Sequence, residues 1–428
     1  MSVAVGALFV GSAGAAETTA TKCADPSGTV KIGMSYFGNV GSAVTAVGGE
    51  GDLVPADQAI VDGYKKGIAA LNAEGGLAGC QVEGVFFNFK ATGSDFNQNS
   101  QQECAAMTQD NEVVAMFGTA FETKVAVDCF AKAKTPLFQI GTNYAPTCAD
   151  YQKYAGYLYN PSGIATCRFG AFIDIWKDAG LFPKDAKVGI LVQTDGSGAN
   201  EALANKVWGP RLKKLKIPYE TFEYTGSTSA AAFSEVNAAL ANAVLKFKAD
   251  GVNVVLLTPG GGQGIAAFTG QANTQGYFPV YGIDSADGFG NAVGIAPNAT
   301  MKGAVGISYA ILDLPLTAQQ ALPANSAITE CATWTTPSTT TLTGASPFCD
   351  YINILHAALG DAKDTTPASL KKGIEGLGTS FVSSLTYDGK TKFGKNRYTG
   401  GIVARVLQYD TATDTFVFMP DQKPRIIP

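Results

Sequence analysis

The sequence predicts an α/β protein with two Rossmann-like lobes, each built on a parallel sheet covered by helices. Short apolar runs alternate with helical segments along most of the chain, and glycines follow many of these runs. The length of 428 residues also exceeds what one hydrophobic core usually organises. Ligands of such sheets bind outside the carboxyl ends of the strands, so the binding chemistry is expected in the loops there.

The segment 113–147, VVAMFGTAFETKVAVDCFAKAKTPLFQIGTNYAPT, shows this pattern most clearly. Apolar runs at 113–117 and 137–140 flank a helical segment, which is typical of two buried parallel strands joined by a helix. The two strands end at Gly118 and Gly141. The residues after these glycines are therefore candidate ligand loops.

The remaining elements of the first series precede this unit. We expect strands at 30–36 and 82–89, and helices at 57–73 and 97–109. Gly75 and Gly76 end the first helix, because glycine adopts the conformation of a helix C-terminus without strain.

A second series of elements starts near Gly163. We expect helices at 164–179, 200–215, 230–248 and up to 272, and strands at 187–192, 218–224, 251–257 and 279–283. Past Thr300 the alternation loosens, with a strand at 303–309, a helix at 350–359 and strand-like segments at 383–387, 401–409 and 415–418. The segment 322–347 is rich in Thr, Ser, Pro and Ala and is predicted to be a long loop.

Composition excludes several classes of function. The net charge is −5 and the basic residues are scattered, so no nucleic-acid partner is expected. The only histidine, His356, lies among apolar residues in YINILHAAL and is interpreted as a packed helix residue. No second histidine or C-x-x-C pair accompanies it, so we expect no metal site, no cofactor and no nucleophilic catalysis. Paired carboxylates for glycoside hydrolysis remain an open alternative.

The N-terminus favours export. MSVAVGALFVGSAGAA carries no charge and has small residues that fit an A-x-A site, like the end of a secretory signal peptide. Residues 1–22 are assigned to this export signal, or alternatively to a disordered N-terminus. No later uncharged run approaches ~20 residues, so a membrane span is not expected. Eight cysteines beside such an N-terminus favour disulfide bonds.

Several motifs, taken in order, resemble the type I periplasmic solute-binding proteins of the leucine/isoleucine/valine-binding kind, which are receptors of ABC importers. They are IGMSYFG, GYKKGIAALNAEGGLAGCQVE, VVAMFG, TPLFQIGTNYAP, KVGILVQTDGSGANEAL, YGIDSADG and SLTYDGKTKFG. The resemblance implies three crossovers between the lobes, near 150–162, 300–306 and 383–390. The first lobe would comprise residues 23–155 and 306–385, and the second 156–305 and 386–428.

The resemblance also implies a set of ligand-binding residues in the first lobe. Glu122 occupies a position at which the family carries a serine that helps to bind the substrate carboxylate. An acid there would repel a carboxylate; alternatively, Thr119 and Glu122 form a capping box, with Thr123 still able to present a hydroxyl. Thr142 and Asn143 match the family's other loop for the carboxylate and ammonium.

The second lobe is expected to contribute Asp284 and Ser197. Asp284 ends a strand at which the family carries an acid that pairs with the substrate ammonium; an N-cap or Asx-turn residue is the alternative. Ser197 lies where the family often has tyrosine, so an aromatic lid is absent or comes from elsewhere.

The sequence therefore predicts a monomeric, non-enzymatic solute-binding protein, secreted or periplasmic. It would close around an amino acid, an amine or another small polar or partly apolar nutrient and deliver it to the membrane permease of an ABC importer. A ligand-sensing extracellular module of the same fold is the alternative, and a secreted hydrolase is a third possibility.

The predicted topology also pairs the cysteines, which by number alone allow about a hundred arrangements. With a 2-1-3-4 strand order, the helices carrying Cys104 and Cys129 are neighbours, and the strands that follow Cys23 and Cys80 are adjacent. The expected bonds are Cys23–Cys80, Cys104–Cys129, Cys148–Cys167 in the first crossover and Cys331–Cys349 in the long loop.

Overall fold

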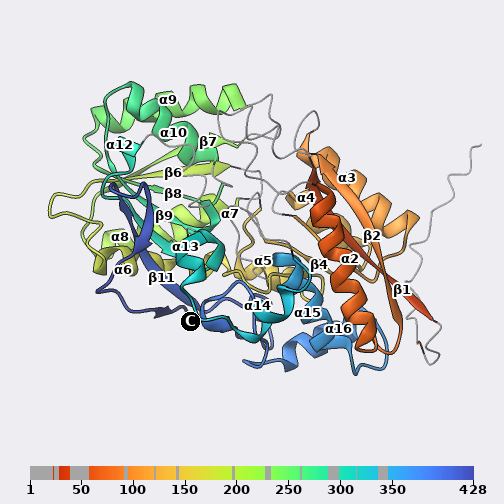
Figure 1. Cartoon of the computed structure of the whole chain (residues 1–428). Helices are drawn as coiled ribbons and strands as arrows, with labels where there is room; N and C mark the ends of the chain where they lie inside the picture. Colours follow the sequence, from red (N-terminus) through yellow and green to blue (C-terminus); the bar gives the residue numbers. More distant parts are fainter. Residues whose placement is uncertain are drawn as a thin grey trace, which may run out of the picture.

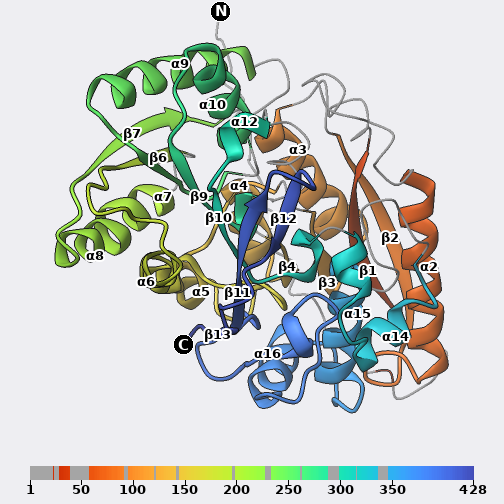
Figure 2. The same ribbon diagram turned by 60° about the vertical axis from the view of Figure 1, so that its left-hand side comes forward.

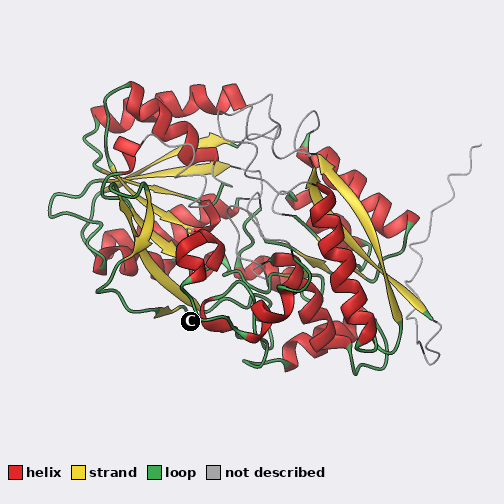
Figure 3. Cartoon of the chain, viewed as in Figure 1, coloured by secondary structure: helices red, strands yellow, loops and turns green. Residues whose placement is uncertain are grey.

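The computed structural model describes residues 23, 28–38, 57–90, 95–119, 122–140, 144–194, 198–226, 233–260, 263–287, 298–314, 316–335 and 346–428. Two sheets with their helices form two lobes, which Figure 1 shows with the first mainly in red and orange and the second mainly in green. Figure 3 shows helices on both faces of the second sheet. The two-lobed α/β fold that the sequence predicts is confirmed.

The sheet of the first lobe is parallel and has the order β2-β1-β3-β4-β5, as the sequence predicts. Its strands are β1 (Thr29–Gly38), β2 (Gln81–Lys90), β3 (Ala115–Phe117), β4 (Leu137–Phe138) and β5 (Leu158–Tyr159). Its helices are α2 (Asp57–Ala73), α3 (Phe96–Ala105), α4 (Lys124–Lys132), α5 (Cys148–Lys153), α15 (Pro347–Leu359) and α16 (Pro367–Gly376).

The sheet of the second lobe is mixed, because β11 runs antiparallel to both of its neighbours β10 and β12. Its strands are β6 (Val188–Thr194), β7 (Tyr219–Thr225), β8 (Val254–Leu257), β9 (Val280–Asp284), β10 (Val305–Ser308), β11 (Val403–Asp410), β12 (Thr415–Phe418) and β13 (Arg425–Ile426). Figure 2 shows β11 and β12 in dark blue at the end of the chain.

Helices cover both faces of this second sheet. They are α6 (Gly170–Asp178), α7 (Ala199–Ala202), α8 (Gly209–Lys214), α9 (Phe233–Ala249), α10 (Gln263–Thr274), α12 (Asn298–Met301) and α13 (Leu316–Gln320). Strand β8 is buried on both faces: Val255 and Leu257 belong to one core cluster, and Val254 and Leu256 belong to the other. Two covered faces explain why the strand is a continuous apolar run.

The chain passes between the lobes later than the sequence predicts. Strand β5 still pairs with β4 in the first sheet, and β10 pairs with β9 in the second. The chain therefore leaves the first lobe after the predicted boundary at residue 155, and it leaves the second lobe after the predicted boundary at residue 305. Asn160 and Thr399 form an isolated bridge, which joins the first crossover to the segment that leads back into β11.

Two local predictions are wrong, and two helices of the first lobe were not predicted. Residues 383–387 do not form a strand, because Asp350 accepts the N–H of Ser384 and thereby removes a group that a ladder would need. The predicted loop 322–347 contains helix α14 (Ser326–Cys331), which Asn325 caps by accepting the N–H of Ile328. The sequence reasoning also overlooked α5 and α16, two short helices of the first lobe.

The structure pairs all eight cysteines as predicted. The Cα atoms lie 5.0 Å apart in Cys23–Cys80, 6.3 Å in Cys104–Cys129, 5.7 Å in Cys148–Cys167 and 5.9 Å in Cys331–Cys349. Cys104 and Cys129 join α3 to α4, which confirms the neighbouring helices that the strand order implies. Within the described ranges, no helix is both long and apolar enough to cross a membrane.

Candidate functional site

A cavity of about 180 Å³ lies where the carboxyl ends of strands from both sheets meet the crossovers. Ile140 enters it after β4, Ser285 and Ala286 after β9, and Tyr309 after β10. The full lining is Ile140, Ala145, Pro146, Tyr151, Asn160, Ser162, Gly163, Ile164, Thr166, Phe169, Ser285, Ala286, Tyr309, Ala310, Leu312, Pro347 and Leu385. This is the place at which ligands of parallel α/β sheets bind.

The lining combines an apolar wall with a few fixed polar groups. The rings of Phe169 and Tyr309 lie 6.1 Å apart between centroids. Asn160 donates to the carbonyl of Ile140 (2.7 Å) and accepts the N–H of Gly163 (2.7 Å), so its amide holds the first crossover against the first lobe. A Cβ on Gly163 would stand 2.2 Å from the Asn160 side chain, which only glycine avoids at this position.

Glu122 lies just before α4 at the carboxyl end of β3 and is only 1% exposed. Its carboxylate accepts the N–H of Thr119, which is the backward bond of the predicted capping box. The helix itself begins at Lys124, and its N-cap is Thr123, which accepts the N–H of Val125, instead of Thr119 as the capping box predicts. Burial raises the pKa of Glu122 to about 7, with the bonds from Thr119 opposing the rise.

Asp284 ends β9 and is fully buried. Its Oδ1 accepts the N–H of Ala286 at 2.7 Å, the short-range bond of an Asx turn. The two residues that follow Asp284 line the cavity, while Asp284 itself lies behind them. The side chain therefore shapes this edge of the cavity, and direct pairing with a ligand stays a prediction.

Thr142, Asn143 and Ser197 lie outside the described residues, as does the segment 1–22. Thr123, which is described, is partly exposed. Its N–H and hydroxyl both donate to Ser100 Oγ at 3.3 Å. The structure thus brings Glu122 and Thr123 together at the end of β3, and places Asp284 in the other lobe.

The sequence reasoning missed a polar cluster at the carboxyl ends of β6 and β8. Gln193 accepts from the hydroxyl of Tyr224 at 3.1 Å, and its own N–H donates to Thr258 at 3.0 Å. Asn200 in α7 donates to the carbonyls of Gln193 (2.8 Å) and Pro259 (2.9 Å). The signal in the sequence was that Gln193, a polar residue, directly follows the buried apolar run of β6. The cluster fixes the ligand-side edge of the second sheet.

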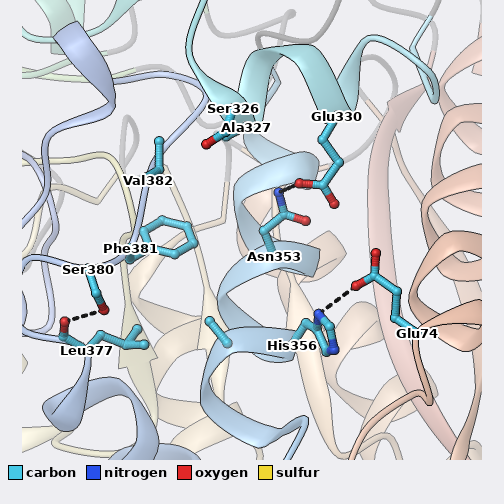
Figure 4. A pocket seen from close by; sticks show the side chains of 11 residues that line it. Glu74, Ser326, Ala327, Glu330, Asn353, His356, Leu377, Ser380, Phe381 and Val382 are labelled. Carbon is cyan, nitrogen blue, oxygen red and sulfur yellow. Dashed lines mark hydrogen bonds and ion pairs between the residues drawn. The ribbon is translucent and has the colours of Figure 1, made fainter.

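A second, larger cavity of about 330 Å³ opens on the first lobe, away from the strand ends (Figure 4). It lies among the end of α2, helices α14 and α15, and residues 377–382. His356 Nδ1 lies 3.1 Å from the Glu74 carboxylate, and Asn353 donates to Glu330 (3.2 Å). His356 is one-third exposed, so its interpretation as a packed residue is wrong: it lines an open polar pocket.

Several solved structures match most of the chain. An ABC transporter substrate-binding protein from Desulfitobacterium hafniense in complex with Leu is 15% identical, with 91% of this chain and 100% of that chain covered and a TM-score of 0.58. A branched-chain amino acid transporter substrate-binding protein from Streptococcus pneumoniae in complex with isoleucine is 16% identical, with 93% and 99% covered and a TM-score of 0.58. A fatty acid ABC transporter substrate-binding protein from Thermomonospora curvata is 15% identical, with 92% of each chain covered and a TM-score of 0.59.

The chain has the type I periplasmic binding protein fold. No family model and no curated protein matches its sequence. In a type I binding protein, the pattern of apolar runs and turns is enough to build the two lobes, and many sequences satisfy it. The resemblance carried by the sequence motifs is therefore confirmed as a likeness of fold.

Proposed function

We propose that this chain is an extracytoplasmic solute-binding protein that captures a small molecule between its lobes and delivers it to the permease of an ABC importer. The observation that carries the proposal is the cavity at the carboxyl ends of both sheets, which residues of both lobes and of the crossovers line. A ligand held there contacts both lobes and favours the arrangement in which they lie close together. The neighbours named above are substrate-binding proteins of transporters, which also supports a binding rather than a catalytic role.

The proposed ligand is small and partly apolar. Phe169, Tyr309 and Ile164 offer apolar surface, while Ser162 and Ser285 offer hydroxyls. We propose that Thr123, Thr142, Asn143 and Ser197 provide further polar contacts. Glu122 and Asp284 are buried, so in this proposal they act from behind the ligand loops.

Mass spectrometry of the small molecules released when the purified protein is denatured tests the proposal. Titration calorimetry then measures the affinity for each released compound, with leucine, isoleucine and a medium-chain fatty acid as probes. A Tyr309→Ala variant should weaken binding at the cavity, while His356→Ala, in the other pocket, should leave the affinity of the folded protein nearly unchanged. Binding that survives Tyr309→Ala and is lost in His356→Ala would move the ligand to the outer pocket.

A further inference from the structure

Two buried carboxyl groups lie near enough in the first lobe for the charge of Glu122 to act on Glu103. Glu103 on α3 is fully buried and Glu122, before α4, is 1% exposed. Helices α3 and α4 are held together here by the Cys104–Cys129 disulfide and by the bonds from Thr123 to Ser100. The sequence reasoning did not consider Glu103, although it is the only acid in the helical sequence FNQNSQQECA.

Hydrogen bonds from Ser35, Thr119 and the Glu122 backbone reach this pair, but no cation among the described residues compensates its charge. The hydroxyl of Ser35 donates to Glu103 Oε1, and the N–H of Thr119 donates to Glu122 Oε1. The Oε2 atoms of both glutamates are buried and form no hydrogen bond among the described residues. None of the ion pairs in the described part of the chain involves either carboxyl.

The other titratable groups that face the pair are tyrosines. Tyr64 comes from α2 and Tyr351 from α15, and the charge of Glu122 adds to the effect of burial in raising the pKa of each. The hydroxyl of Tyr64 donates to the carbonyl of Ser35 at 3.3 Å, whereas that of Tyr351 is buried and has no hydrogen-bond partner in the described part of the chain. Two unpaired negative charges in such surroundings are costly, so the folded protein favours a protonated form.

We infer that Glu103 keeps its proton at neutral pH while Glu122 gains and loses one, and that the charge on Glu122 positions the backbone of Thr119 at the ligand face of the first lobe. Burial and then the negative charge of Glu122 hold the pKa of Glu103 well above its usual range. Burial raises that of Glu122 to about 7. Glu122 therefore titrates first, and its ionisation makes the loss of the Glu103 proton still harder.

Glu122 is a positioning residue in this account. A charged acceptor binds an N–H more strongly than a neutral one, so Thr119 is held more firmly above pH 7 than below it. Gly118 permits the arrangement, because a Cβ there would stand 2.8 Å from the carboxyl carbon of Glu122. The role of this turn in ligand binding rests on the proposed function. The protonation of Glu103 and Glu122 does not depend on that function.

Nuclear magnetic resonance of the ligand-free protein tests the inference, with [13Cδ]glutamate and [15N]threonine labels followed from pH 5 to 9. We expect the Glu122 carboxyl to titrate near pH 7, the Glu103 carboxyl to remain in the protonated range while Glu122 ionises, and the Thr119 amide shift to follow Glu122. The variants Glu103→Gln and Glu122→Gln assign the signals. Glu83→Gln, on the exposed edge of β2, is the matched control and should change neither titration.

The two variants also separate the role of Glu122 from that of Glu103. Glu122→Gln should abolish the pH response of Thr119 and move the Glu103 titration to lower pH, while Glu103→Gln should retain the response of Thr119. An ionised Glu103 at pH 7 in the parent protein, as a bound cation would produce, overturns the inference. A Thr119 amide shift that stays constant between pH 6 and 8 also overturns it. The parent protein alone decides both points if a variant does not fold, and failure to find a ligand would leave these titrations unchanged.

Discussion

Asp350 anchors the third crossover to the first lobe, and its replacement should change how stability depends on pH. Asp350 is fully buried in the first turn of α15. Its Oδ1 accepts the N–H of Ser384 at 2.6 Å and its Oδ2 accepts the hydroxyl of Ser383. The Ser383 oxygen in turn accepts the N–H groups of Leu385 (3.0 Å) and Thr386 (3.1 Å). One carboxylate therefore organises the backbone of residues 383–386, which lie in the predicted third crossover.

Burial raises the pKa of Asp350 from 3.8 to about 6, although the bonds from Ser383 and Ser384 oppose the rise. The folded protein therefore binds a proton that the unfolded chain has already lost between about pH 4 and pH 6. The stabilisation by this proton is complete below about pH 4 and is lost as the pH rises through 6. The gap between the two values corresponds to about 3 kcal/mol.

Asp350→Asn removes this titration while keeping the shape of the side chain. Urea unfolding of both proteins, with the disulfides intact, should be measured from pH 4 to pH 7.5. The free energy of unfolding of the parent minus that of Asp350→Asn should fall by about 3 kcal/mol from pH 4 to pH 7. Subtracting the variant removes the contributions of every group that titrates equally in both proteins.

Asp350→Ala is the companion variant, because it leaves the N–H of Ser384 without its acceptor. A buried unsatisfied donor costs about 1–3 kcal/mol, and this loss should be present at every pH. Parallel pH profiles for the parent and Asp350→Asn would refute the reasoning, since they would mean that Asp350 has the same pKa in the folded and unfolded chains.

Three further predictions concern the disulfides, the site and the lobes. Replacing Cys104 and Cys129 by serine should cost about 3.5 kcal/mol of unfolding free energy in the chain-entropy model for their separation of 25 residues; peptide mapping without reduction should first recover all four bonds. Asp284→Ala should weaken ligand binding, because it leaves the N–H of Ala286 at the edge of the cavity without its acceptor, at a cost of about 1–3 kcal/mol, and His356→Ala should not; calorimetry on the folded fraction decides this, and an unchanged affinity in Asp284→Ala would mean that this turn does not position the site. Saturation at 100 times the dissociation constant should add about 2.7 kcal/mol of stability and reduce the radius of gyration; equal radii in small-angle scattering with and without a tightly bound ligand would contradict lobe closure.

The sequence by itself determined the two lobes and the disulfide framework. Buried parallel strands must be apolar on both faces and must end in turns, so the predicted runs 113–117 and 251–257 contain β3 and β8, which begin at Ala115 and Val254. Given the 2-1-3-4 strand order, right-handed crossovers put the two helices side by side, and this brings Cys104 to Cys129 without any knowledge of side-chain positions. These features depend on local pattern and on topology, which a sequence records directly.

Only the tertiary structure decided which polar side chains are exposed and what they contact. Glu122 and Asp284 fit ligand positions in the sequence, yet both are buried and bond to the backbone of their own turns. Glu103 approaches Glu122 because α3 packs on α4, and Asp350 meets Ser383 across 33 residues of chain. The environment of a carboxyl depends on neighbours that are distant in sequence. Burial and pairing therefore set its charge and role only after the chain has folded.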